Sequence, residues 1–122
     1  MIEQTMKAIG AGARRAARVL AMTDDETRNA ALTAAADAIR RRRGDILAAN
    51  RVDMEEGAGR GLSAAMLDRL MLDDDRIEAM ASGVTAVAGL GDPLGKVLAE
   101  WDRPNGLVIQ RVSVPLGVIG II

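Results

Sequence analysis

The sequence predicts an α/β fold in which about five helices are followed by a β-hairpin and by the first strand of a parallel sheet. Three observations support this prediction, beginning with apolar side chains that recur at helical spacing through residues 3–90. A Pro-Asn-Gly turn then separates two β-branched runs. Residues 116–122 are almost wholly apolar and do not alternate, which is typical of a strand buried on both faces of an α/β sheet. The elements that would cover this strand are expected outside these 122 residues.

The first two helices are predicted from periodicity and from capping signals. Met6 and Leu20 lie on the face of the first helix that should be buried. Thr23 followed by Glu26 fits a capping box, so Thr23 should be the N-cap of the second helix. Gly44 follows four arginines and is expected to end that helix, because glycine is favoured just beyond helix C-termini.

Three further helices are expected before the hairpin. Asp45 can cap the third helix, which should point Asn50 inward and be broken by a glycine cluster. Ser63 should open a short fourth helix, and the acidic residues 73–75 mark the start of a fifth, which Gly89 ends. The breaking glycines are Gly57, Gly59 and Gly61.

The last part of the chain is predicted to be β-structure. Residues 96–101 and 107–114 should be strands on either side of a turn at residues 102–106. A third run, 116–122, follows after a proline. Trp101 is the only aromatic residue in the chain. It is expected to be a core anchor at the end of the hairpin, with stacking on a ligand as the alternative.

The composition excludes several classes of protein. Hydrophobic residues make up 49% of the chain, so disorder is not expected. The 16 basic and 17 acidic residues leave a net charge of −1, so we expect neither nucleic acid nor an acidic membrane as a partner. Without cysteine or histidine, the chain has no disulfide, no thiol nucleophile and no histidine base. No apolar stretch is long enough to span a bilayer and no signal-peptide pattern is present, so we expect a cytoplasmic protein.

Three clusters suggest ligand binding, and for each we favour a structural interpretation. The glycines of residues 57–61 resemble a phosphate loop, but Leu62 stands where a glycine is required and the cluster follows a helix, so a helix end is favoured. The four arginines at 40–43 are better explained as a solvated helix end than as a phosphate site. Residues 73–75 could bind a divalent cation, but no loop of ligand spacing surrounds them. The residues alone therefore indicate a helical and hairpin scaffold, without a nucleophile–base pair, metal cluster or phosphate cradle.

Four blocks of the sequence nevertheless carry a specific resemblance. They are DILAAN at 45–50, GLSAAMLDRL at 61–70, GDPLG at 91–95 and RVSVPLGVIGII at 111–122. In this order they resemble the N-terminal third of the gamma-glutamyl phosphate reductase family, also called glutamate-5-semialdehyde dehydrogenase, within the aldehyde dehydrogenase superfamily. The second block and the VPLGVIG part of the fourth are its most specific parts.

The resemblance implies an NADPH-dependent reductase of proline biosynthesis. Its small-molecule substrate would be L-glutamyl 5-phosphate and its product L-glutamate 5-semialdehyde. In the family a cysteine thiolate attacks the acyl phosphate, and hydride from NADPH reduces the thioester that forms. That cysteine lies downstream of the matched region, so we assign no catalytic residue and no metal ligand here, and we expect the isolated chain to be inactive. Ile122 is the single candidate cofactor-binding residue.

The resemblance also implies a division of the chain. Residues 1–90 would be the helical N-terminal part of the cofactor-binding domain. Residues 91–114 would be the hairpin of a bridging element used in oligomer contacts, and residues 115–122 the first strand of the cofactor-binding sheet. We therefore expect a homo-oligomer formed through the hairpin. Two alternatives remain: a non-catalytic interaction module derived from that fold and, less compatible with the net charge, a small nucleic-acid binder built on residues 40–43.

Overall fold

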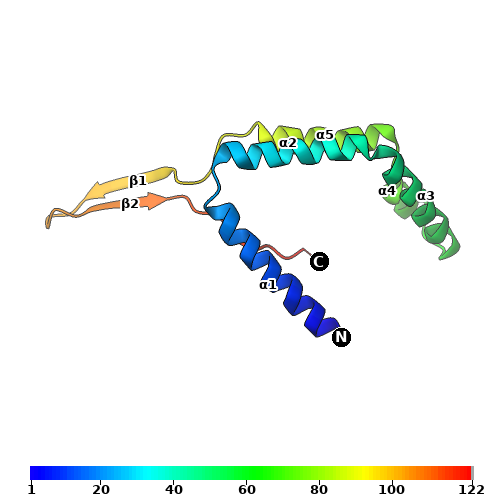
Figure 1. Cartoon of the computed structure of the whole chain (residues 1–122), viewed down its shortest axis with the longest axis horizontal. Helices are drawn as coiled ribbons and strands as arrows, with labels where there is room; N and C mark the ends of the chain where they lie inside the picture. Colours follow the sequence, from blue (N-terminus) through cyan, green and yellow to red (C-terminus); the bar gives the residue numbers. More distant parts are fainter. Residues whose placement is uncertain (122) are drawn as a thin grey trace. The chain divides into compact units, whose positions relative to one another are not determined.

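The computed structural model describes residues 1–121, and these form five α-helices followed by a two-stranded hairpin (Figure 1). The predicted order of helices and hairpin is thereby confirmed. The elements are α1 (Ile2–Ala21), α2 (Asp25–Arg41), α3 (Arg43–Gly59), α4 (Ala64–Leu70), α5 (Asp74–Ala88), β1 (Val97–Asp102) and β2 (Val108–Val112). The chain divides into two compact units: a helical unit, Glu26–Leu90, and a second unit that combines Met1–Asp25 with Gly91–Ile122.

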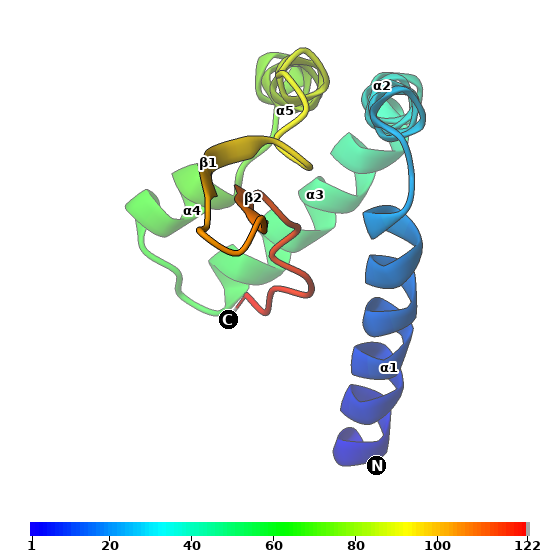
Figure 2. The ribbon, with the colours of Figure 1, turned by 90° about the vertical axis from the view of Figure 1, so that its left-hand side faces the viewer.

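The helical unit is organised around α2 and α5, which lie side by side (Figure 2). Its buried apolar side chains are Ala36 on α2 and Ile77 and Ala81 on α5, each at most 1% exposed. Arg40 on α2 and Glu78 on α5 form an ion pair of 2.8 Å between the two helices. Because this core contains no aromatic side chain, each buried residue removes only a modest apolar area from water.

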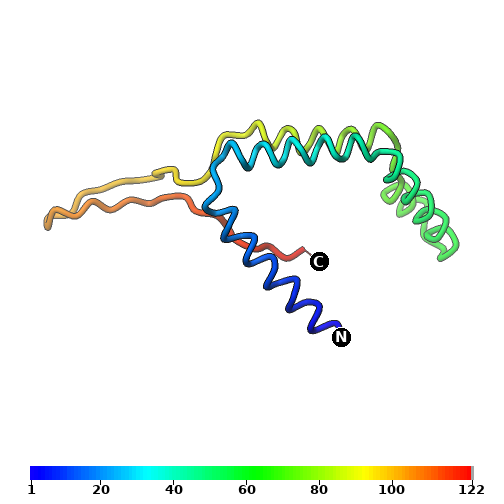
Figure 3. Tube along the Cα trace, in the orientation of Figure 1, coloured from blue at the N-terminus to red at the C-terminus, as the bar shows by residue number. Residues whose placement is uncertain are grey.

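The junction of α2 and α3 is a bend in a nearly continuous helix, whose course Figure 3 traces. Arg42 donates its backbone N–H to the Ala38 carbonyl at 2.9 Å, and Ile46 donates to the Arg42 carbonyl at 3.0 Å. The prediction that Gly44 ends the second helix is therefore wrong, because helical hydrogen bonds continue across the junction. Gly44 and Asp45 both lie in the first turn of α3, so Asp45 is not its cap.

The predicted helix caps have mixed outcomes. Thr23 is not the residue before α2, which begins at Asp25. The Thr23 hydroxyl donates to the Val19 carbonyl in the last turn of α1, at 2.8 Å. The predicted starts of α4 and α5 are confirmed, and Ser63 Oγ and Asp73 Oδ1 cap them: each accepts from the backbone N–H three residues later, at 3.3 and 2.8 Å.

The glycine cluster after residue 56 serves packing as well as helix termination. α3 continues through Gly57 and ends at Gly59, so the prediction that Gly57 breaks the helix is wrong. A Cβ atom on Gly57 would lie 2.9 Å from Cδ1 of Leu62, so any other residue at this position would force the Leu62 side chain to move. Gly61, with φ of +76°, adopts the left-handed conformation that commonly follows a helix end.

The hairpin prediction is confirmed. β1 and β2 pair antiparallel, with Trp101 opposite Ile109. The N–H of Gly106 donates to the Arg103 carbonyl at 2.9 Å, and Gly106 has a φ of +84° that favours glycine. The prediction that Trp101 is a core anchor is wrong for the structure described here, since 41% of its surface is exposed. A two-stranded ribbon has no second layer in which to bury an indole ring.

The second unit exposes most of its apolar side chains. α1 contains no buried residue, which differs from the predicted buried face. Residues 115–121 form no strand, and Ile121 is 94% exposed. A strand requires a neighbour for its backbone N–H and C=O groups, and none pairs with this segment in residues 1–121. Ile122, the predicted cofactor-binding residue, lies outside the described residues. No helix within residues 1–121 combines the length and the apolarity that a membrane span requires.

Candidate functional site

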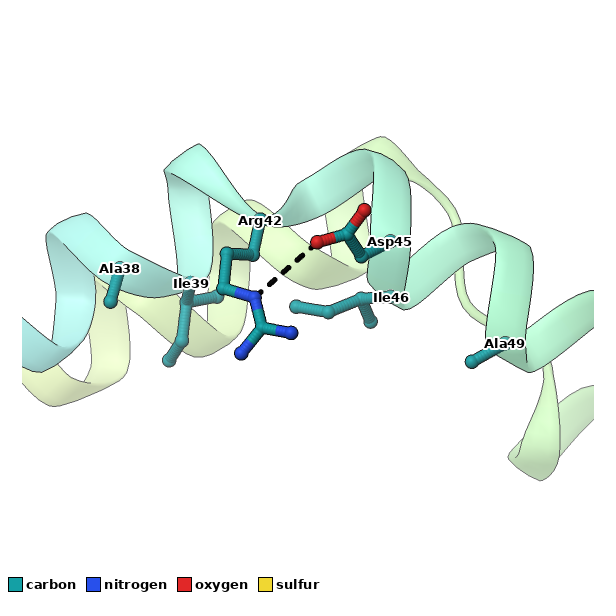
Figure 4. A pocket seen from close by; sticks show the side chains of 6 residues that line it. All are labelled: Ala38, Ile39, Arg42, Asp45, Ile46 and Ala49. Carbon is teal, nitrogen blue, oxygen red and sulfur yellow. Dashed lines mark hydrogen bonds and ion pairs between the residues drawn. The ribbon is translucent and has the colours of Figure 1, made fainter.

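A groove of about 340 Å³ at the α2–α3 bend is the main candidate for binding a small ligand (Figure 4). Four of its six lining residues are aliphatic, and the other two are an arginine and an aspartate. They are Ala38, Ile39, Arg42, Asp45, Ile46 and Ala49. The volume is at the lower end of the range for ligand pockets, so a small apolar group is the occupant that fits its lining.

Arg42 and Asp45 neutralise each other at this groove. Arg42 Nε donates to Asp45 Oδ2 at 3.3 Å, and both side chains are 73% exposed. Asp45 is the only carboxylate among the six lining residues, so no second group is present to share acid–base chemistry with it. The groove therefore has the character of a contact surface and not of a catalytic centre.

The arginine run at the end of α2 is engaged in ion pairs within the chain. Arg40 donates to both carboxylate oxygens of Glu78, and Arg43 lies 3.2 Å from Asp74. The hydrogen bonds from Arg40 and, to a lesser extent, from Ser82 hold the pKa of Glu78 below its ordinary value. The interpretation as a solvated helix end is thus only partly right, because these cations join α2 and α3 to α5.

The acidic run at residues 73–75 acts as a helix start. Asp73 caps α5, and Asp74 forms an ion pair with Arg43. In residues 1–121 no group of three or more potential ligands is placed to hold a metal ion. The glycines at 57–61 end α3 and follow no strand, so they lack the strand–loop–helix setting of a phosphate loop.

Asn50 is the one buried polar side chain within residues 1–121, at 7% exposure, and it points inward as predicted. Its Nδ2 donates to the Leu70 carbonyl at 2.9 Å, and its Oδ1 accepts from the Leu72 N–H at 2.8 Å. The amide thereby satisfies the backbone where α4 ends and the chain turns toward α5. These two hydrogen bonds from one side chain align α3 with the α4–α5 connection.

Arg76 holds the same connection from the side of α5, a role that was not predicted above. Its guanidinium donates to the Met71 carbonyl at 2.8 Å, to the Asp68 carbonyl, and to Asp68 Oδ1 at 3.0 Å. A signal for this role is present in the sequence. An arginine in the first turn of a helix opposes the helix dipole, so it needs a partner that compensates for this placement.

No protein-family model matches the chain. Curated gamma-glutamyl phosphate reductases are similar to it over almost its whole length. The protein from Brucella anthropi is 53% identical over 121 residues, and that from Paramagnetospirillum magneticum is 56% identical over 121 residues. Each similarity covers 99% of this chain but only 28% and 29% of the respective relative. The chain therefore spans less than a third of the length of these relatives.

Two solved structures of gamma-glutamyl phosphate reductases share the fold. The Thermotoga maritima enzyme matches 84% of this chain and 25% of its own, with a TM-score of 0.80 and 41% identity. The Saccharomyces cerevisiae enzyme matches 88% of this chain and 28% of its own, with a TM-score of 0.82 and 32% identity. The chain matches the N-terminal part of the gamma-glutamyl phosphate reductase fold.

Within this part of the gamma-glutamyl phosphate reductase fold, two of the blocks that carried the resemblance are in direct contact. Asn50, the last residue of block 45–50, binds the backbone of Leu70, the last residue of block 61–70. These residues serve the packing of α3 against α4 and α5. The full sequence contains no cysteine, so the thiol expected from the family is not among these residues.

Proposed function

We propose that this chain supplies the N-terminal helical and hairpin part of a reductase that converts L-glutamyl 5-phosphate to L-glutamate 5-semialdehyde in proline biosynthesis. The observation that carries this proposal is the 53–56% identity to curated gamma-glutamyl phosphate reductases over 121 residues. The similarity covers the helices and the hairpin alike, because it extends over 99% of the chain. The segmentation into residues 1–90, 91–114 and 115–122 belongs to the same proposal.

NADP is the proposed cofactor, and its binding residues are proposed to lie mainly outside residues 1–121. The described residues do not fit a cofactor cradle, since no glycine-rich turn there follows a strand and opens a helix. Ile122 stays a proposed cofactor contact. We therefore derive no reaction step from the residues of this chain, and assign to them the packing that supports the rest of the enzyme.

Homo-oligomer formation through the hairpin is a further part of the proposal, together with a cytoplasmic location. Within residues 1–121, β1 and β2 pair only with each other, so each has one unpaired edge. Val97, Leu98 and Val108 are 51–62% exposed on this ribbon. An exposed two-stranded ribbon of this kind is marginally stable alone and favours coverage by another chain or segment.

The proposal is tested with two proteins. One is the 122-residue chain, and the other is a chimera in which this chain precedes the remainder of the Paramagnetospirillum magneticum reductase. We expect the isolated chain to be inactive in phosphate-dependent NADP reduction with glutamate semialdehyde, and the chimera to be active. Activity of the isolated chain would contradict the proposal. A chimera that folds and oligomerises without activity would favour the non-catalytic interaction module instead.

A further inference from the structure

Two ion pairs lie on either side of the α2–α3 bend and end on the same helix. Arg40, in the last turn of α2, donates through Nε and Nη2 to the Glu78 carboxylate at 2.8–3.2 Å. Arg43, the first residue of α3, places Nε 3.2 Å from Oδ1 of Asp74. Asp74 and Glu78 are four residues apart, so they lie one turn apart on one face of α5. The helices on both sides of the bend are thereby tied to a single element.

Buried packing does not reach the bend itself. The buried residue nearest to the bend on α2 is Ala36, and the nearest on α3 is Asn50. Every residue from 37 to 49 is at least partly exposed. A Cβ atom on Gly44, in the first turn of α3, would meet no other side chain within 4 Å. The core therefore anchors α2 and α3 at points well separated from the bend, and the two ion pairs lie between those points.

The groove at the bend takes its lining from both helices (Figure 4). Ala38 and Ile39 belong to α2. Ile46 and Ala49 belong to α3. Because the two halves of this lining lie on opposite sides of the bend, the shape of the groove depends on the bend angle.

We propose that these two ion pairs together fix the angle of the α2–α3 bend, and that salt releases it. Exposed ion pairs are individually weak, because ordering two long side chains offsets most of the Coulomb attraction. Here the first pair already places the helix that carries the second, so the second forms at high effective concentration. The four side chains are 37–66% exposed, so dissolved ions reach and screen both pairs. Asp37, which lies 3.6 Å from Arg40 within α2, gives that cation a partner in the released state.

The test measures the distance across the bend in the 122-residue chain, which has no cysteine of its own to interfere with spin labelling. Ala34→Cys on α2 and Glu55→Cys on α3 carry the labels, because both positions are exposed and neither belongs to an ion pair of the bend. With helical arms of roughly 12 and 20 Å, a change of about 20° in the bend shifts the label distance by roughly 2–3 Å. Double electron–electron resonance resolves a shift of this size.

At about 20 mM salt the parent chain should give one narrow distribution of distances. At about 1 M salt, where the Debye length is about 3 Å, the distribution should shift or broaden by roughly 2 Å or more. Arg40→Gln combined with Arg43→Gln should give the high-salt distribution at both concentrations. The matched control is Arg42→Gln, an arginine of the same run whose partner Asp45 lies on α3 and not on α5. This control should behave as the parent chain does.

Circular dichroism verifies that each protein keeps its helix content. A parent distribution that does not change with salt would overturn the proposal, whether or not the double variant folds. A double variant with the parental low-salt distance, or one that still responds to salt, would overturn it too, because backbone hydrogen bonds and packing would then fix the bend. An Arg42→Gln chain that behaves like the double variant would refute the role of the pairs with α5, in favour of a general effect of charge in the arginine run.

Discussion

Replacing Asn50 by alanine should cost the helical unit more stability than any other single polar truncation on α3. The substitution removes the bonds to the Leu70 carbonyl and the Leu72 N–H, of 2.9 and 2.8 Å. Both backbone groups belong to half-buried residues, so leaving each without a partner costs about 1–1.5 kcal/mol of unfolding free energy. The better helix propensity of alanine offsets roughly 0.5 kcal/mol. The net loss is therefore about 2 kcal/mol of unfolding free energy.

The assay is urea unfolding of the 122-residue chain followed by circular dichroism at the helical band. With a slope of about 1–2 kcal/mol/M for a small protein, the Asn50→Ala midpoint should fall by roughly 1–2 M. The matched control is Arg51→Ala, which truncates an exposed neighbour on the same helix. A difference between the two variants of less than about 0.5 kcal/mol would refute the reasoning, since that is the usual effect of a surface change.

A second variant separates the two bonds of Asn50. Asn50→Asp keeps the acceptor for the Leu72 N–H but places a carboxylate oxygen against the Leu70 carbonyl. At neutral pH this variant should be less stable than the parent chain. Protonation lets the Asp side chain donate to Leu70, so the folded state should raise its pKa. The difference from the parent should then shrink as the pH falls through this raised pKa, and the change should be complete below the unfolded pKa of about 4. A difference independent of pH would show that the Leu70 bond is unimportant.

Three further predictions concern packing, charge and turn conformation. Gly57→Ala should be about 1 kcal/mol less stable than Gly59→Ala in urea unfolding, because the Cβ at position 57 would displace the Leu62 side chain and the Cβ at position 59 would meet open space. The reverse order of stability would contradict this. Because Arg40 lowers the pKa of Glu78, the pair stabilises the fold at pH values above the ordinary glutamate pKa of 4.5. This contribution is lost as the pH falls through the lower folded pKa. Glu78→Gln should therefore flatten the acid side of the stability–pH profile at low salt, and an unchanged profile would argue against the pair. Gly106→Ala should weaken the hairpin by about 1 kcal/mol, because alanine is strained at the positive φ of this position. The loss of cross-strand contacts in NMR spectra would report this.

Local signals in the sequence were sufficient where neighbouring residues decide the conformation. The helices α4 and α5 begin at Ser63 and at the acidic run 73–75 as predicted, because a helix start needs only its capping side chain and the next turn of backbone. The hairpin follows from its Pro-Asn-Gly turn and flanking β-branched runs for the same reason. The inward position of Asn50 was also predictable, since helical periodicity places it on the apolar side of α3.

Predictions failed where a residue has more than one possible role. Gly44 carries a stop signal, yet the backbone hydrogen bonds of Arg42 and Ile46 carry the helix past it. Gly57 is a residue type that breaks helices, but it lies within α3, where the Leu62 side chain packs against it. No sequence motif marks the role of Arg76, because its three acceptors lie in and before the α4–α5 connection and come within reach only in the folded chain. In each case contacts between separate elements outweigh local propensity.

The sequence by itself determined the order of elements, the absence of cysteine and histidine chemistry, and the resemblance to the reductase family. Periodicity, turn residues and composition act over a few residues and need no tertiary contacts to be recognised. Only the tertiary structure decided that the arginine and aspartate clusters form ion pairs and a helix cap within the chain. It also decided that blocks 45–50 and 61–70, which carry the family resemblance, meet at Asn50. It also decided that the apolar face of α1 is open, because burial depends on what lies across from a face and not on the pattern along it.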